Sequence, residues 1–250
     1  MKHMRMLVLG FGLAVLFCGE PVTGHAFDVG GPVYGKDLQG SLGLELIVEH
    51  FDREVKISFD TLGKKETEGL NETVLMGRFH LSLGKDALLY VDAGLIDDDD
   101  AESTPLVIGL GADILVYEQQ KLRLNVVAAG HWVPSFDLEE KTRYHVLHTS
   151  GEEEYYELGA GMLVSGNLPF DRQTKVVPYG GIMFSMLRGS VDVDAHYGPV
   201  NLHGSADIEE DNPLVVVAGI SLLFQQGFSF RMEARFIGDS SLSVGLGIAF

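Results

Sequence analysis

The sequence predicts an all-β fold, a membrane-spanning antiparallel up-and-down β-barrel of about ten strands. Many segments carry apolar residues at alternate positions, and most reach the 9 to 11 residues that a tilted strand needs to cross a bilayer. Long and short connections alternate between these segments. Thirty-one glycines in 250 residues, with no sustained helical period, also favour β-structure. Together these observations place the chain among closed sheets, because lipid tolerates no unpaired sheet edge.

The N-terminus carries the features of an export signal. Lys2 and Arg5 give a basic start, an apolar run follows, and small residues precede Phe27. This run is too short to cross a bilayer as a helix, so we predict that residues 1–26 are a cleaved signal peptide. Residues 27–250 then form the barrel domain. They contain no cysteine, so no disulfide or thiol chemistry is expected.

The first five predicted strands combine an apolar row with a polar or small row, because successive side chains of a strand point to opposite faces. In the first, Leu44 and Leu46 alternate with Glu45 and Glu49. This strand continues less regularly to Phe59, which predicts that it projects beyond the membrane. The five predicted strands cover residues 43–59, 73–83, 87–95, 105–117 and 122–132.

The second five predicted strands follow the same pattern with one exception. The two faces of residues 175–187 cannot be assigned from the pattern, whereas the strand at residues 214–224 carries a continuous apolar row. The last strand ends the chain on an aromatic residue. These five strands are predicted at residues 153–165, 175–187, 214–224, 228–237 and 241–250.

The connections are predicted to be loops and turns of two kinds. The long ones are residues 62–72, 96–104, 133–151 and 189–212, and shorter turns alternate with them. Transmembrane barrels show this alternation, with short periplasmic turns and longer external loops. Pattern-based boundaries err by a few residues, so eight or twelve strands also fit. The competing class is a soluble β-sandwich, which the export signal and the terminal Phe250 disfavour.

The final strand also carries a resemblance. Leu246, Ile248 and Phe250 lie at alternate positions of SLSVGLGIAF, which resembles the assembly signal of bacterial outer-membrane β-barrels. The chain as a whole resembles the broad OmpA-like and porin-like superfamily. The resemblance implies a location in the outer membrane of a Gram-negative-type bacterium. It also implies outer-membrane lipid, lipopolysaccharide and the barrel-assembly machinery as partners.

If the apolar rows face lipid, the alternate rows face the lumen. Charges removed from bulk water must be paired, so we expect salt bridges inside a barrel of this size, similar to the plugged interior of OmpA-like domains. The alternative interpretation is a narrow ion path. The predicted charge network consists of Glu45, Glu49, Arg78, Asp92, Asp113, Arg123, Glu157, Arg231, Glu233 and Arg235, with His80 and Asn125 on the same faces.

Aromatic residues lie near the ends of several predicted strands. An apolar ring with a polar tip is stable at the membrane–water interface, so we interpret them as membrane anchors. The set comprises Tyr90, Tyr117, Trp132, Tyr155, Tyr156, Phe236 and Phe250.

Acidic and histidine residues supply the candidate metal and catalytic sites. The carboxylates of Asp97, Asp98, Asp99 and Asp100 are candidate calcium ligands, but they lack EF-hand spacing, and a solvated acidic loop is the simpler interpretation. Four histidines form a second candidate metal set without a fixed spacing: His145, His148, His196 and His203. No cofactor is expected.

Two hydrolase hypotheses remain open. Asp192, Asp194 and His196 lie in one predicted loop, where an Asp beside a His activates water. In strand number and two acidic loops the chain resembles the omptins, outer-membrane proteases, although their residue patterns are not matched closely. Lipid-modifying barrels use Ser and His with an acidic partner, for which Ser185, His131 and His80 are present.

The leading functional hypothesis is a non-enzymatic outer-membrane barrel with a role in envelope structure or surface interaction. The alternative is a narrow porin or channel for small solutes or small apolar molecules, and an envelope hydrolase ranks third. The net charge of −18 argues against a nucleic-acid partner.

Overall fold

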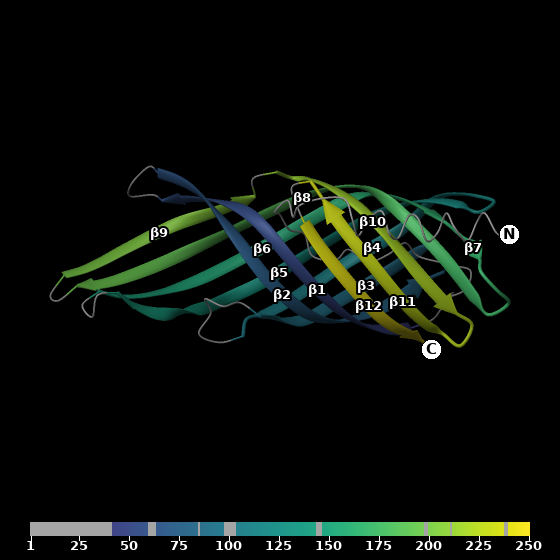
Figure 1. Cartoon of the computed structure of the whole chain (residues 1–250), viewed down its shortest axis with the longest axis horizontal. Helices are drawn as coiled ribbons and strands as arrows, with labels where there is room; N and C mark the ends of the chain where they lie inside the picture. The colour runs from purple at the N-terminus through teal and green to yellow at the C-terminus, as the bar shows by residue number, and fades with distance from the viewer. Residues whose placement is uncertain are drawn as a thin grey trace.

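The chain folds into a closed antiparallel barrel of ten strands, which confirms the predicted fold class (Figure 1). The computed structural model describes residues 42–59, 64–84, 86–97, 104–143, 147–197, 200–210, 212–237 and 240–250. The barrel strands are β1 (Leu42–Phe59), β2 (Lys64–Leu83), β3 (Ala87–Asp97), β4 (Leu106–Gln119), β5 (Leu122–Arg143), β6 (Leu147–Gly166), β8 (Thr174–Tyr197), β10 (Leu214–Phe224), β11 (Phe228–Phe236) and β12 (Ser240–Ala249).

The barrel closes because the first and last strands pair. The antiparallel register between β1 and β12 runs from Gly43 opposite Ala249 to Asp52 opposite Ser240. Two strands lie outside the ten: β7 (Leu168–Pro169), which pairs with β8, and β9 (Val200–Glu210). No α-helix long and apolar enough to cross a membrane occurs among the described residues.

The two ends of the barrel differ. The turn end carries the short connections β2–β3, β4–β5, β6–β8 and β10–β11 together with the chain's C-terminus, where the Leu42 amide donates to the Phe250 carbonyl at 3.2 Å. Gly227 has a φ of +86° in the β10–β11 turn, which side chains rarely adopt. In the β6–β8 turn, the Gln173 amide donates to Asp171 Oδ1 at 2.7 Å, and this bond lowers the pKa of Asp171.

The opposite end, which we call the hairpin end, carries long strands that continue past the ends of the shorter barrel strands. β5 and β6 pair to Arg143 opposite Leu147, and β8 pairs with β9 to Tyr197 opposite Val200. The predicted loops at residues 133–151 and 189–212 are therefore wrong, because most of their residues belong to these hairpins. The predicted loop at residues 62–72 is wrong for the same reason, since β2 begins at Lys64.

Beyond the barrel the hairpins form one sheet in the order β5-β6-β8-β9-β1-β2. In this sheet β9 lies beside β1, with Val55 opposite Glu210, and takes the place that β10, β11 and β12 hold lower in the wall. Figure 1 shows these hairpins reaching past the shorter strands. The β5 edge is interrupted by two register shifts and by Pro134, which are features that discourage edge-to-edge pairing.

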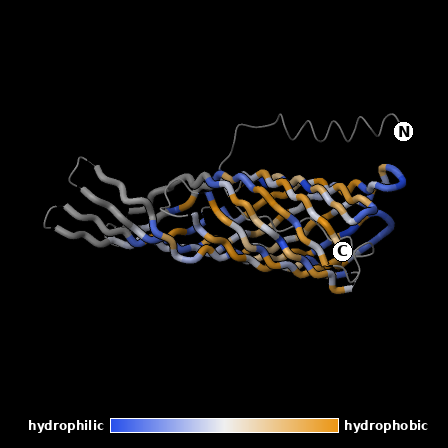
Figure 2. The backbone as a smooth tube through the Cα atoms, turned by 90° about the horizontal axis from the view of Figure 1, so that it is seen from below, coloured by the Kyte–Doolittle hydropathy of each residue, from blue (hydrophilic) through white to orange (hydrophobic). Residues whose placement is uncertain are grey.

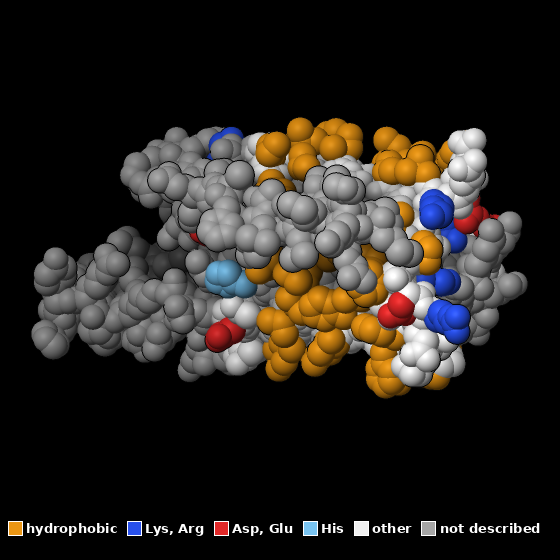
Figure 3. All heavy atoms as spheres, turned by 45° about the vertical axis from the view of Figure 1, so that its right-hand side comes forward, with side chains coloured by type: hydrophobic (Ala, Val, Ile, Leu, Met, Phe, Trp, Pro, Cys, Tyr) orange, Lys and Arg blue, Asp and Glu red, His pale blue; other side chains and the backbone are white. Residues whose placement is uncertain are grey.

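The outer surface carries an apolar belt. The predicted lipid-facing rows are exposed in the isolated chain, and Leu110 is the most exposed large hydrophobic side chain among the described residues, at 68%. Figure 3 shows hydrophobic side chains gathered in a band, with charged side chains on either side of it. Figure 2 shows hydrophobic and hydrophilic residues alternating along the strands. This arrangement is that of a barrel whose exterior faces hydrocarbon.

The unassigned faces of residues 175–187 are resolved by the barrel. Ile182, Phe184 and Met186 are exposed on the outer face, whereas Met183 and Ser185 are buried on the inner face. The sequence pattern failed here because both rows are apolar or small, so hydropathy alone does not distinguish them.

Candidate functional site

The interior of the barrel holds a first ion network centred on Asp92. Arg78 from β2 donates to both carboxylate oxygens, with Nε to Oδ1 and Nη2 to Oδ2 each at 2.8 Å. His131 Nε2 from β5 lies 3.0 Å from Asp92 Oδ2. The Arg78 guanidinium also lies 4.0 Å from the ring centroid of Tyr90. All four side chains are buried, so a bidentate pair, an imidazole and a cation–π contact share one dry site.

A second ion network joins β1 and β11. Arg231 Nη2 lies 2.9 Å from Glu45 Oε1, and Arg235 Nη2 lies 2.9 Å from Glu233 Oε1. Two longer contacts of 3.7 Å link Arg231 to Glu233 and Arg235 to Glu49. Two cations and three carboxylates thus form one chain of charges, and the pairing offsets the cost of removing them from water.

Three further contacts belong to the polar interior. Asn125 donates to Asp113 at 2.6 Å, and Ser185 donates to Glu157 at 2.7 Å. Arg123 Nη2 lies 3.0 Å from Glu118 Oε1. The ten residues of the predicted charge network all lie on inward-facing rows, and nine of them are buried. Their contacts are distributed around the wall of the barrel.

Several interior residues were missed by the sequence analysis. Glu118 was assigned to a turn. Tyr179 belonged to the strand at residues 175–187, whose faces were not assigned, and its hydroxyl donates to Glu233 at 2.8 Å. Tyr155 donates to Glu72 at 3.3 Å from the far side of the barrel. Tyr179 lies an even number of positions from Leu187, so strand alternation places both side chains on the same face. Glu118 could not be found in this way, because a register shift between Leu115 and Tyr117 interrupts the alternation before it.

Glycines on the inner face make room for the aromatic rings. A Cβ at Gly111 would overlap the Tyr90 ring, and one at Gly219 would overlap the Tyr179 ring. Each ring therefore lies flat across a glycine of the neighbouring strand, as Gly111 is opposite Tyr90 and Gly219 opposite Tyr179 in the register. The ring covers exposed backbone and supports the polar contacts beside it.

Above the ion networks, toward the hairpin end, lies an apolar cluster. We call it the hairpin-end cluster. Its side chains come from β1, β2, β3, β4, β5, β6, β8 and β9, so they meet from most of the circumference. The cluster comprises Ile47, Phe51, Val55, Val74, Met76, Ile96, Val107, Val133, Phe136, Tyr155, Leu187 and Ile208. Six members have an exposed fraction of 0%: Ile47, Val55, Val74, Met76, Val107 and Val133.

The candidate hydrolase residues are not arranged for catalysis where the structure describes them. Ser185 and His131 have different acidic partners, Glu157 and Asp92, and both are buried. A substrate therefore reaches neither group. His80 is half-buried on the inner face, and its ring lies against Gly43.

The predicted loop residues Asp192, Asp194 and His196 lie in the extended part of β8. The sequence already indicated a strand here, because Val191 and Val193 alternate with Asp192 and Asp194 as strand residues do. Asp192 is exposed. In the backbone register Asp194 is opposite His203, and His196 is opposite His148.

Several residues of the two candidate metal sites lie outside the described residues. Asp97 ends β3 and is exposed, whereas Asp98, Asp99 and Asp100 lie outside the described residues, as does His145. Across the described part of the chain, no group of three or more metal-ligating side chains is close enough to hold an ion. The predicted signal peptide, residues 1–26, also lies outside the described residues.

The aromatic residues divide into two groups. Tyr117, Trp132, Tyr156, Phe236 and Phe250 are exposed on the outer surface, where anchoring at the membrane interface is their expected role. Tyr90 and Tyr155 are buried inside the barrel, so the anchoring prediction is wrong for these two. Their position in the alternation, not their nearness to a strand end, decides the face.

The terminal residues of the predicted assembly signal lie on the outer face. Phe250 is 66% exposed, and Leu246 and Ile248 are exposed on β12. Deleting Phe250 is expected to reduce the amount of folded barrel in the outer membrane, since the aromatic residue is part of the proposed signal. Heat-modifiable gel migration of membrane fractions measures this amount. Normal assembly of the truncated chain would contradict the proposed signal.

A substitution at the same end of the barrel serves as the control for this deletion. Replacing Phe228, which is likewise exposed at the turn end, removes an outward aromatic without touching the C-terminus. Phe228→Ala is expected to assemble normally.

Comparison with known proteins gives a likeness of fold. No protein-family model and no curated protein matches the chain. The chain is similar to the outer-membrane protease OmpT from Escherichia coli, with a TM-score of 0.49, 7% identity, and coverage of 89% of this chain and 100% of that one. It is similar to the translocator domain of the autotransporter NalP from Neisseria meningitidis, with a TM-score of 0.45, 13% identity, and coverage of 84% and 88%.

A third similar structure is the outer membrane protein AlkL in lipid bilayers, with a TM-score of 0.40, 10% identity, and coverage of 93% of this chain and 97% of that one. At these identities the likeness is one of fold. These neighbours are outer-membrane β-barrels of differing functions.

Proposed function

We propose that the protein is a non-enzymatic barrel of the outer membrane of a Gram-negative-type bacterium, with a lumen closed to solutes. Its role is structural support of the envelope, with the long hairpins as a surface for interactions. The observation that carries this proposal is the hairpin-end cluster, whose side chains meet across the lumen from eight strands.

The burial of the cluster's side chains supports a closed lumen. A residue that lines a water-filled passage touches water and therefore keeps accessible surface. Ile47 on β1, Val107 on β4 and Val133 on β5 keep none. The cross-section at this level is thus filled by close-packed apolar groups, as in a protein core. Passage of a hydrated ion would require both desolvation and displacement of these side chains.

The orientation follows from the two ends. The turn end, with the C-terminus and short turns, suits the periplasm, and the hairpin end suits the exterior. Export by residues 1–26 and assembly through Leu246, Ile248 and Phe250 belong to the same proposal. The exterior hairpins are acidic, with Glu152, Glu154 and Asp192 exposed, so lipopolysaccharide contacts there involve cations or the protein's own basic groups.

Single-channel recording of the refolded barrel in planar bilayers tests closure. The unmodified chain is expected to give no discrete conductance steps, with folding confirmed by heat-modifiable gel migration. The double variant Phe51→Ser/Met76→Ser, which removes two large side chains from the cluster, is expected to give steps because water enters the widened lumen.

The matched control is Leu46→Ser, on β1 but on the outer face, which is expected to stay silent. Reproducible steps from the folded, unmodified chain would overturn closure and favour the narrow channel for small solutes. A silent double variant that is folded would show that the cluster is not what closes the lumen.

A further inference from the structure

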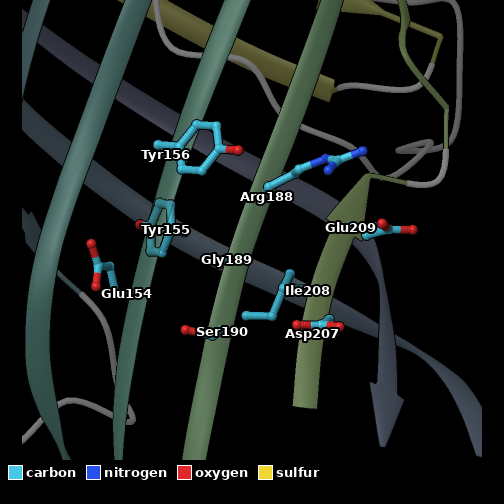
Figure 4. A pocket seen from close by; sticks show the side chains of 9 residues that line it. All are labelled: Glu154, Tyr155, Tyr156, Arg188, Gly189, Ser190, Asp207, Ile208 and Glu209. Atoms are coloured by element: carbon cyan, nitrogen blue, oxygen red, sulfur yellow. The ribbon is translucent and has the colours of Figure 1, made fainter. Parts of the chain in front are cut away.

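An open pocket of about 310 Å³ lies between β6, β8 and β9, and its lining residues form three rows across these strands (Figure 4). The register gives the rows: Tyr156 opposite Arg188 and Arg188 opposite Glu209, then Tyr155, Gly189 and Ile208, then Glu154, Ser190 and Asp207.

The pocket opens on the outer face of the wall. The first and third rows are exposed, whereas Tyr155 and Ile208 of the middle row point into the hairpin-end cluster. A middle row directed inward leaves only backbone on the outer side. The outer rows therefore form the two rims of a hollow, with the backbone of the middle row as its floor.

The level of the pocket coincides with the end of the apolar belt. One outward position closer to the belt, β6 carries Leu158 next to Tyr156, and β8 carries Met186 next to Arg188. Both Leu158 and Met186 are exposed and apolar. Trp132 on β5 is opposite Tyr156 and donates to Glu154 Oε1 at 3.0 Å. Exposed Trp and Tyr rings directly above an apolar belt mark the depth of lipid headgroups.

The rim nearest the belt combines cations with a carboxylate. Arg188 is opposite Glu209, and Lys56 on β1 is opposite Glu209 from the other side. Directly opposite residues of antiparallel strands lie about 4.5 to 5.5 Å apart at Cβ. Among the lining residues this rim carries one positive charge, Arg188, and one negative charge, Glu209, and Lys56 adds a second positive charge beside the rim on the neighbouring strand.

The geometry points to a phosphorylated lipid of the surrounding leaflet as the occupant of this pocket, with Arg188 as the ligand of the headgroup phosphate. The inference rests on the membrane location in the proposed function. Arginine binds phosphate through two parallel charge-assisted hydrogen bonds. The adjoining Leu158 and Met186 contact the acyl chains, and the Tyr156 ring lies between the two environments.

The apolar belt beside the pocket favours a lipid over a free anion. Glu154 and Asp207 make the other rim acidic, and carboxylates repel soluble phosphate. A lipid gains apolar contacts along the belt that a free ion lacks, so it overcomes this repulsion. We therefore expect the site to bind a phosphate that is attached to acyl chains more tightly than free phosphate.

Native mass spectrometry of the full-length barrel in a sugar-based detergent tests the inference. The probes are dioleoyl phosphatidic acid and dioleoylglycerol, which has the same chains but no phosphate. We expect phosphatidic acid to be retained and dioleoylglycerol to be lost. Arg188→Gln is expected to lower the apparent affinity for phosphatidic acid about tenfold, because it removes a charge-assisted contact.

The control variant is Arg172→Gln, an identical substitution at an exposed site in the turn end, which is expected to leave retention unchanged. Equal retention of the two lipids, or equal affinity in the Arg188→Gln variant, would overturn the inference. Displacement by inorganic phosphate would indicate an ion site, and loss of binding on chelation would indicate a carboxylate-held cation; either result overturns the lipid site.

Insertion of the same preparation into liposomes is measured separately by protease protection. Failure to insert contradicts the proposed membrane location itself. Normal insertion without lipid selectivity contradicts only the pocket.

Discussion

Asp92→Ala is expected to lower the free energy of unfolding by about 3 to 5 kcal/mol. The carboxylate accepts two hydrogen bonds from Arg78 and lies 3.0 Å from His131 Nε2. Its removal leaves the Arg78 guanidinium buried without its main counter-charge, and this uncompensated charge accounts for most of the cost. Reversible urea unfolding of the barrel in lipid vesicles, followed by tryptophan fluorescence, measures the change.

The control for Asp92 is Asp137→Ala, the same substitution at an exposed position on β5. It is expected to change stability by less than about 0.5 kcal/mol. The double variant Asp92→Ala/Arg78→Met is expected to be more stable than the single variant, since it removes both charges. A small effect of Asp92→Ala, or no recovery in the double variant, would contradict the assigned ion network.

Leu110→Arg is expected to destabilise the barrel by about 2 to 4 kcal/mol. Leu110 lies on β4 with its side chain 68% exposed to the outside, opposite Val91 on β3 in the register. In a bilayer this position faces hydrocarbon, where a guanidinium loses its hydration. The same unfolding experiment measures the loss.

A matched control separates membrane depth from a general effect of arginine. Leu122→Arg introduces the same residue at the first position of β5, at the turn end and on the outer face. The cost near the interface falls to about 0 to 1 kcal/mol. Equal effects at Leu110 and Leu122 would mean that the apolar belt does not span a bilayer.

The interior of the barrel has two layers with different roles. The ion networks around Asp92 and Glu233 connect strands far apart in the sequence, with Arg231 and Glu45 separated by 186 positions. The hairpin-end cluster lies between these networks and the hairpins, and its side chains are buried. The closed lumen that we propose rests on these two layers.

Local alternation was sufficient to predict the fold class and the outward rows, and it gave the strand number as about ten, with eight or twelve also possible. The period of two is a property of each strand by itself, so Leu44 and Leu46 identify a lipid-facing row without knowledge of any neighbour. The same alternation placed Arg78, Asp92 and Glu233 on inward rows. It failed where both faces are apolar or small, as at residues 175–187, and where a register shift precedes Tyr117.

Only the tertiary structure decided which inward groups meet. The partners of Asp92 come from strands whose order around the wall depends on every intervening pairing, and a list of inward charges contains no such information. The hairpin-end cluster was missed because its members come from eight strands and converge only when the sheet closes. The pocket beside Arg188 depends on β9, which was read as a loop, since its polar outer row masked the alternation.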